Sequence, residues 1–486
     1  MNTVVRQFFT FLFLIFLVHG CAINPVTGEQ DFVLISEDEE LEIGREQHKS
    51  VMGHYKAYQH EELQNYVTQL GEELADISHR KEIIFHFTVL DSQEVNAFAL
   101  PGGYIYITRG LLSHLNNEAQ LVGVIGHEIG HVTARHGVKQ QSKATVAQIL
   151  TTILGATTGN RHASDIGQLL GMTIITGYGR AHELEADRIG AEYMAHLGYD
   201  PEELLGVIGV LKAQEEFDKE LAKEEDREPR YYHGIFATHP DNDKRLQELI
   251  KAAGAKYKGK DLKANQQEFF KRIDGLIIGP GEHEGVVRGR YFYHKELDFK
   301  ISFPPKWKIE NHPHYIRAFT PNKKIVIQVG MRDLNRKVGP KEFIKRKFKD
   351  ECKQGRVIKT EDFEGYTCIV ELDHPEWGER PARYAIIYRT PKDAFEIMAT
   401  TEESDLKYFD GHFLSTINSV RKLKKADLKE AEPKRIKIIK VEKGDTFAKY
   451  AHISNLGNRA EDKIRILNNA YPKGEPTPGT YVKIVQ

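Results

Sequence analysis

The stretch that decides the fold is Glu118-Ala-Gln-Leu-Val-Gly-Val-Ile-Gly-His127-Glu128-Ile-Gly-His131-Val-Thr-Ala-Arg-His136. It is apolar on almost every face of a helix, which predicts a buried α-helix. His127 and His131 are four positions apart, so a helix places both imidazoles one turn apart on one face, within reach of one metal ion. Burying two imidazoles and a carboxylate is costly unless a partner neutralises them, and a divalent metal is such a partner.

Residues at both ends of this stretch are typical of helix caps. Asn117 is a good N-cap, with Gln120 three residues later as its capping-box partner. Gly137 is placed to end the helix in the left-handed conformation. The caps therefore support a helix around the two histidines.

A second segment supplies the ligand that a metal site still needs. His-Glu-x-x-His is the signature of zinc metallopeptidases, in which Glu128 is the general base. Catalytic zinc takes three protein ligands. Residues 180–190 predict a helix in which Glu183 can be the third ligand, while Asp187 accepts a hydrogen bond from the far nitrogen of a ligand histidine. An ordinary solvated helix face with surface ion pairs is the alternative for this segment.

The two segments together resemble the gluzincin peptidases of the family that contains HtpX, BepA and the CAAX prenyl endopeptidases, family 48 of the metallopeptidases. In that family Glu-x-x-Ala-Asp follows the histidine helix, and Glu183, Ala186 and Asp187 match it. Arg180 matches the Arg usually found three residues before that Glu, whereas the preceding Ser is replaced by Gly179. The resemblance implies one bound Zn²⁺, with Asp187 and Arg180 beside the ligands. The implied zinc ligands are His127, His131 and Glu183.

The resemblance extends upstream to the segment Asn96-Ala-Phe-Ala-Leu-Pro-Gly-Gly-Tyr-Ile-Tyr-Ile-Thr-Arg-Gly-Leu-Leu112. Residues 104–108 are rich in β-formers and follow a Pro-Gly-Gly turn, which predicts a strand. In the family this region contains an edge strand that holds the substrate by main-chain pairing. An ordinary hairpin is compatible with the same pattern. The implied substrate-binding residues are Asn96, Ala97, Phe98 and Ala99.

Downstream, Thr238-His239-Pro240 followed by Arg245 also matches the family. In periplasmic relatives such a histidine approaches the metal and keeps the enzyme latent, so His239 is a candidate fourth ligand or latch. Considered alone, a histidine before proline is an ordinary loop residue. We expect four other histidines to have no part in the chemistry: His114, His136, His162 and His182.

The beginning of the chain predicts export. Residues 8–18 are an apolar run too short to span a bilayer, and Val18-His-Gly-Cys21 is similar to a lipoprotein cleavage box. We expect residues 1–20 to be a signal peptide, Cys21 the lipidated first residue and 21–37 a tether. Ala22 favours the outer membrane, by resemblance to bacterial sorting rules. A plain secretory signal with cleavage elsewhere is the alternative.

The length of 486 residues predicts two to four domains. The net charge is −2 with both signs mixed, and no basic patch with interleaved aromatic residues indicates a nucleic-acid partner. We expect a multidomain chain: a mainly α, zincin-like metallopeptidase domain with a small β-sheet (38–275), an α+β domain around an antiparallel sheet that is loosely similar to PsbP (285–422), a charged linker (423–435) and a small strand-helix-helix-strand domain (436–486).

The last of these segments resembles the LysM module, which binds glycans containing N-acetylglucosamine. The resemblance rests on Gly444-Asp-Thr446 and on Pro478-Gly479 before the final strand. It implies peptidoglycan as a partner. A module that keeps the fold without the ligand is the alternative.

Two cysteines besides Cys21 are left, Cys352 and Cys368. A disulfide between them is allowed in an oxidising compartment, and two separate buried thiols are the alternative.

These patterns predict a lipid-anchored, periplasm-facing zinc endopeptidase of the bacterial envelope. Its substrates would be unfolded or misassembled envelope proteins, by analogy with relatives in quality control. The rival from another class is a chaperone or scaffold that uses the peptidase fold for binding. Such a scaffold has no need of Glu128.

Overall fold

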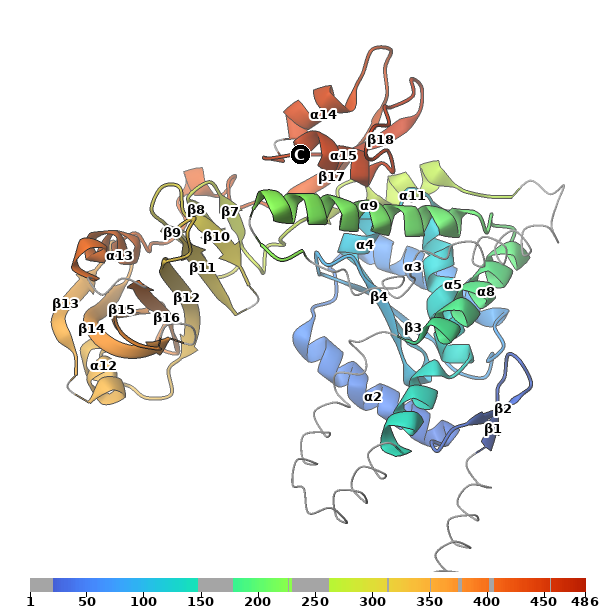
Figure 1. Ribbon diagram of the computed structural model, residues 1–486, viewed down its shortest axis with the longest axis horizontal. Helices are drawn as coiled ribbons and strands as arrows, with labels where there is room; N and C mark the ends of the chain where they lie inside the picture. The colour runs from blue at the N-terminus through green and yellow to red at the C-terminus, as the bar shows by residue number, and fades with distance from the viewer. Residues whose placement is uncertain are drawn as a thin grey trace, which may run out of the picture. The chain divides into compact units, whose positions relative to one another are not determined.

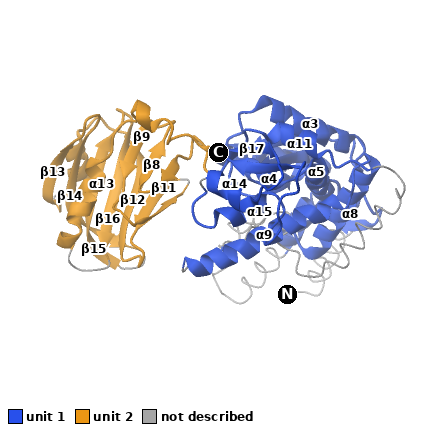
Figure 2. Ribbon diagram, turned by 90° about the horizontal axis from the view of Figure 1, so that it is seen from above, with its two compact units in different colours: residues 1–278, 435–486 blue, residues 279–434 orange. Residues whose placement is uncertain are grey.

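The structure is a computed structural model that forms two compact units: residues 1–278 with 435–486, and residues 279–434 (Figure 2). We call these unit 1 and unit 2. Within the described residues, no helix combines the length and apolar character needed to cross a bilayer. The structure describes residues 21–146, 178–225, 227–229, 262–312, 314–349, 351–374, 378–401, 406–454 and 456–486.

Unit 1 is built mainly from helices around a small sheet (Figure 1). Its helices are α2 (Glu37–His54), α3 (Glu61–Asp76), α4 (Arg109–His114), α5 (Glu118–Thr133), α8 (Arg180–His196), α9 (Glu203–Glu224), α11 (Gln266–Ile273), α14 (Phe447–Ser454) and α15 (Ala460–Leu467). Its strands are β1 (Cys21–Ile23), β2 (Gln30–Phe32), β3 (His86–Leu90), β4 (Ala97–Leu100), β5 (Tyr104–Thr108), β6 (Ile277–Ile278), β17 (Lys434–Lys440) and β18 (Tyr481–Val485).

One three-stranded sheet of unit 1, which borders the candidate site described below, has the strand order β3-β5-β4. β5 pairs in parallel with β3 and antiparallel with β4, so β4 is an edge strand. Gly102 and Gly103 join β4 to β5 with φ of 77° and 92°, values that glycine adopts without strain. The expected strand at 104–108 is confirmed.

The C-terminal residues 435–486 group with unit 1. β17 pairs with β18 and with β6, and the backbone N–H of Ile436 donates to the carbonyl of Leu276 at 2.8 Å. Ile436 is buried in the same hydrophobic core as α5. Strand pairing thus joins 435–486 to the rest of unit 1, and the expected domain bounds stay a prediction. The element order of this tail is the one that the LysM resemblance implies, but LysM identity itself stays a prediction.

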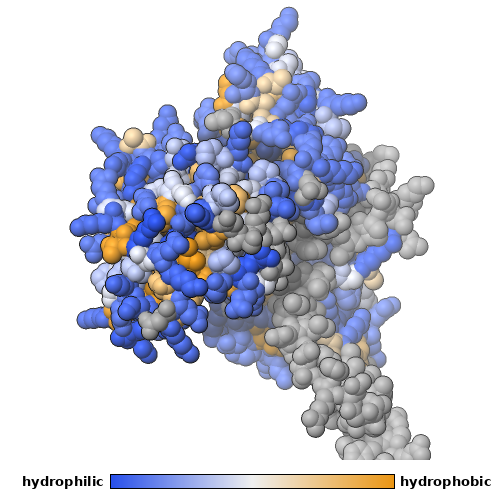
Figure 3. All heavy atoms as spheres, turned by 60° about the vertical axis from the view of Figure 1, so that its left-hand side comes forward, coloured by the Kyte–Doolittle hydropathy of each residue, from blue (hydrophilic) through white to orange (hydrophobic). Residues whose placement is uncertain are grey.

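Unit 2 is an α+β unit. A seven-stranded antiparallel sheet has the order β10-β11-β12-β16-β15-β14-β13, and a smaller sheet has the order β7-β8-β9. Residues of the expected linker belong to unit 2: the Asp427 carboxylate accepts hydrogen bonds from Arg421 and Lys300 at 2.6 and 2.8 Å. The surface facing the viewer in Figure 3 is mostly hydrophilic, and hydrophilic side chains break up its hydrophobic areas. The elements are β7 (Val286–Arg288), β8 (Tyr291–His294), β9 (Phe299–Ser302), β10 (Lys308–Asn311), β11 (Tyr315–Phe319), β12 (Ile325–Asp333), α12 (Pro340–Phe348), β13 (Lys353–Lys359), β14 (Glu364–His374), β15 (Gly378–Tyr388), β16 (Asp393–Thr401) and α13 (Asp410–Asn418).

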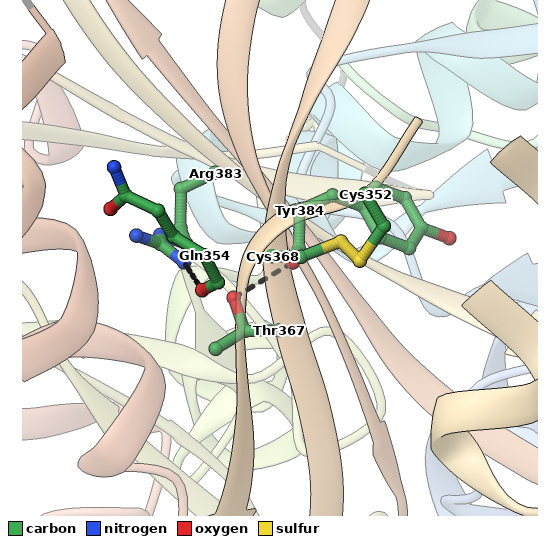
Figure 4. Close-up of a disulfide and its surroundings, with 6 residues drawn as sticks. All are labelled: Cys352, Gln354, Thr367, Cys368, Arg383 and Tyr384. Carbon is green, nitrogen blue, oxygen red and sulfur yellow. Dashed lines mark hydrogen bonds between the residues drawn. A yellow bond between two sulfur atoms is a disulfide. The ribbon is translucent and has the colours of Figure 1, made fainter. Parts of the chain in front are cut away.

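A disulfide joins Cys352 and Cys368 in unit 2 (Figure 4). It ties the residue directly before β13 to the middle of β14, the strand that pairs with β13 in the sheet. Of the two states left open by the sequence, the structure has the bonded one.

Candidate metal centre and active site

Helix α5 carries His127, Glu128 and His131, and it is buried along its whole length. The side chain of Asn117 accepts a hydrogen bond from the backbone N–H of Gln120 at 2.8 Å, so the predicted N-cap is confirmed. The cap fixes where the helix begins, and therefore which face its histidines share.

The end of α5 differs from the expected one. The helix ends at Thr133, and Arg135 adopts the left-handed conformation with φ of 56°. The Arg135 guanidinium holds this turn: Nε donates to Oε2 of Glu40 at 2.8 Å and Nη2 to the carbonyl of Ile35 at 3.1 Å. Gly137 lies inside the next helical stretch and is not the C-cap. The turn brings His136 back toward the candidate ligand His131.

Helices α5 and α8 pack with their backbones close together. A Cβ atom on Gly126 would lie 3.2 Å from Cα of Gly190, and one on Gly130 would lie 3.1 Å from Cα of Ala186. Small residues on both helices permit this approach. The close crossing brings Glu183, on the first turn of α8, to the histidines of α5.

The three expected ligands converge. Nε2 of His127 lies 3.0 Å from Nε2 of His131, and Oε2 of Glu183 lies 3.4 and 3.7 Å from these two nitrogens. All three side chains are buried, with their ligand atoms within 4.8 Å of one another. Among the described residues, this is the one group of three or more such side chains able to hold a metal ion.

Two carboxyl groups adjoin the ligands. Oδ1 of Asp187 lies 2.8 Å from Nδ1 of His127, a contact that leaves Nε2 of the ring to face the cluster. Burial raises the pKa of Glu128 to about 7, against the opposing effect of His127 and with a contribution from the nearby Glu183. A backbone hydrogen bond with Ala99 acts in the opposite direction and links Glu128 to strand β4.

The structure places the other expected site residues as follows. Asn96 precedes β4, and its carbonyl accepts a hydrogen bond from the N–H of Thr108 at 3.0 Å. Ala97, Phe98 and Ala99 belong to β4 itself, at the edge of the sheet. Arg180 is exposed at the first position of α8 and is not among the buried groups of the cluster. Cys21 begins β1, while His239 lies outside the described residues.

One residue that we expected to have no part in the chemistry lies against a candidate ligand. Nδ1 of His136 is 2.9 Å from Nδ1 of His131, a contact that the sequence pattern did not predict. The ring of Tyr178 also stacks on His131, with centroids 4.0 Å apart. The sequence signal for His136 is its position five residues after a ligand, but a continuous helix would turn such a residue away from His131.

Comparison with known proteins agrees with these motifs. Residues 61–253 match peptidase family M48. The chain carries a peptidase family M48 domain. Two curated relatives share this region: the Beta-barrel assembly-enhancing protease of Escherichia coli (strain K12), 28% identical over 46% of this chain and 45% of that protein, and the Mitochondrial metalloendopeptidase OMA1 of Arabidopsis thaliana, 35% identical over 28% of each. The match thus spans less than half the length of either relative.

A solved structure of cyanobacterial PsbP (CyanoP) from Synechocystis sp. PCC 6803 is also similar, at 10% identity over 29% of this chain and 96% of that chain, with a TM-score of 0.23. At this score the two structures do not establish a shared fold, and the PsbP resemblance stays a prediction.

Proposed function

We propose that this M48-domain chain is a zinc-dependent endopeptidase. The observation that carries the proposal is the buried convergence of His127, His131 and Glu183, with Glu128 next to the first ligand on the same helix. Both curated relatives are named as a protease or metalloendopeptidase. Each of them is matched over less than half its length, so the activity is proposed here on the site itself.

The donor set fits zinc. Two imidazole nitrogens and one carboxylate oxygen are a known ligand set of catalytic zinc, which keeps its fourth position open. The three side chains are buried and close together, an arrangement in which a divalent cation offsets the cost of burying the carboxylate. His127, His131 and Glu183 would hold the ion, with Asp187 orienting His127.

Glu128 is suited to the role of general base. A bound zinc ion supplies a Lewis acid that polarises the scissile carbonyl and makes water more acidic. The Glu128 carboxylate would take the proton from the attacking water and, as the carboxylic acid, deliver it to the leaving amine. Burial raises the pKa of Glu128 toward the working pH, and a general base works best when its pKa lies near that pH.

The substrate is an extended polypeptide. The edge strand β4 can pair with a peptide main chain by strand addition, and the Glu128–Ala99 contact places this edge beside the general base. We propose Asn96, Ala97, Phe98 and Ala99 as the residues that line the bound peptide.

We further propose a place for the enzyme in the bacterial cell envelope. The segment ending at Cys21 supports a lipid anchor facing the periplasm, with the outer membrane favoured by Ala22. Unfolded or misassembled envelope proteins would be its substrates. The LysM-like tail is proposed to contact peptidoglycan, and His239 to act as a latch or fourth ligand.

The test is cleavage of a denatured protein by the full chain, with and without a chelator. We expect cleavage that the chelator abolishes and zinc restores, and none with Glu128→Gln. The matched control is Glu62→Gln on the exposed first turn of α3, which should cleave normally. If the unaltered chain binds the denatured protein but never cuts it, the chaperone or scaffold alternative is correct.

A further inference from the structure

His131 is linked to the N-terminal segment by a series of side-chain contacts through His136, Glu185 and Asn24, which we call the relay. Its Nδ1 lies 2.9 Å from Nδ1 of His136, and Nε2 of His136 lies 3.1 Å from Oε2 of Glu185. The other oxygen of Glu185 accepts a hydrogen bond from Nδ2 of Asn24 at 3.3 Å. Glu185 lies on α8, two residues after the ligand Glu183.

One arrangement of protons satisfies every contact in the relay. A neutral imidazole has one N–H and one acceptor nitrogen. If Nε2 of His131 faces the metal, its Nδ1 must donate to His136. His136 then accepts at Nδ1 and donates from Nε2 to the Glu185 carboxylate. The relay therefore selects the tautomer of His131 whose Nε2 lone pair is available to a metal ion.

The surroundings of His136 hold it in this position. Its side chain is fully buried, and the ring of His182 stacks on it with centroids 4.3 Å apart. The preceding residue, Arg135, sets the direction of the chain through its left-handed conformation and its hydrogen bond to Glu40. His136 thus has little freedom to leave His131.

Asn24 is also fixed in place. Its side-chain oxygen accepts hydrogen bonds from the backbone N–H groups of Val26 and Thr27 at 2.9 and 3.3 Å, and it is 4% exposed. These bonds direct the amide nitrogen at Glu185. The ligand His127 needs no such relay, because Asp187 contacts it directly.

We propose that His136 and Glu185 are positioning residues for the metal ligand His131, and that Asn24 makes the N-terminal segment part of the metal centre. The inference rests on the proposed function, since it needs a metal ion at the cluster. It predicts that the contacts of the segment after Cys21 tune metal affinity without altering Glu128.

The first experiment measures Zn²⁺ affinity of the full chain by competition with a coloured chelator, together with the visible absorption spectrum after Co²⁺ substitution. His136→Ala should weaken zinc binding about 10- to 100-fold, the range found when the partner of a ligand histidine is removed. Glu185→Ala should act in the same direction, and Glu185→Gln, which keeps an acceptor for His136, should lose less. The cobalt bands should shift with His136→Ala because they report ligand geometry, which a loss of global stability does not change.

The second experiment separates the relay from general docking of the N-terminal segment. Asn24→Ala should weaken zinc binding by less than about 10-fold, because it acts one contact further away. The matched control is Asp31→Asn, which removes the ion pair of the same segment with Lys139 but touches no member of the relay. Its zinc affinity should equal that of the unaltered chain.

Unchanged zinc affinity and cobalt spectrum in His136→Ala, in a background where the unaltered chain binds zinc and cleaves, would overturn this inference alone. If His136→Ala does not fold, as judged by circular dichroism without metal, the Glu185 pair decides: equal affinity of the Gln, Ala and unaltered proteins overturns it. An unaltered chain that binds no zinc would overturn the proposed function as well.

Discussion

The side-chain nitrogen Nζ of Lys483 donates a hydrogen bond to the carbonyl oxygen of Leu115 at 2.7 Å, across 368 positions of sequence. A second bond runs from the same group to the carbonyl of Ser113 at 2.9 Å. Lys483 is fully buried on β18, and the two acceptors lie at the end of α4, just before α5 begins. The C-terminal tail thus supports the segment from which α5, the helix with both candidate histidine ligands, starts.

Lys483→Met should therefore destabilise unit 1. The variant keeps most of the side-chain volume but leaves two buried carbonyl groups without their donor. Each carbonyl group left unpaired costs about 1–3 kcal/mol of folding free energy. Urea unfolding followed by circular dichroism measures the change. Lys440→Met, at an exposed position of β17, is the control and should unfold like the unaltered chain. Equal midpoints for both variants would contradict this account of the tail.

Gly190→Ala should separate the two helices of the site. A Cβ at this position would lie 2.9 Å from the backbone nitrogen of His127, so α8 must move away from α5. We expect weaker zinc binding, reduced cleavage and a loss of about 1–3 kcal/mol of stability from overpacking. Gly209→Ala on an exposed position of α9 is the matched control, because its nearest neighbour is 3.8 Å away. It should gain about 0.5–1 kcal/mol from helix propensity and bind zinc normally.

Acid should weaken unit 2 through Asp427. Although burial opposes ionisation, hydrogen bonds from Arg421 and Lys300 hold the pKa of the Asp427 carboxyl well below its usual value. A lowered folded-state pKa contributes stability that is present above the unfolded pKa of about 3.9 and is lost as pH falls toward the folded pKa. Asp427→Asn should thus be less stable than the unaltered chain at pH 7, with the difference shrinking below about pH 4. Denaturant unfolding at several pH values tests this, and a difference that grows in acid would contradict it.

Loss of the disulfide should also weaken unit 2. Cys352 and Cys368 are 16 positions apart, and a crosslink that closes a loop of this size stabilises by about 3 kcal/mol in the chain-entropy account. The double variant Cys352→Ser and Cys368→Ser should lower the unfolding midpoint of unit 2 and leave zinc affinity unchanged. Mass spectrometry of the unreduced chain checks the bond directly, and two free thiols there would contradict the prediction.

Local patterns in the sequence were sufficient to predict the parts of the site that lie on helices and strands. The four-residue spacing of His127 and His131, the cap at Asn117 and the strand at 104–108 each depend on contacts within a few residues, so their patterns predict them directly. Glu183 was also recognisable, because its motif occupies the first turn of a helix. Arg180 shares that turn, but its exposed position could not be read from the same pattern.

The sequence by itself determined which residues can hold a metal ion and which can act as a base, since these follow from residue type and helical spacing. Only the tertiary structure decided that His136 contacts His131, because the turn at Arg135 depends on Glu40, 95 positions away. It likewise decided that the C-terminal tail belongs to unit 1, through the buried Lys483 and the pairing of β17 with β6. Such contacts join segments far apart in the chain, and short-range patterns carry no information about which distant partner completes a buried hydrogen bond.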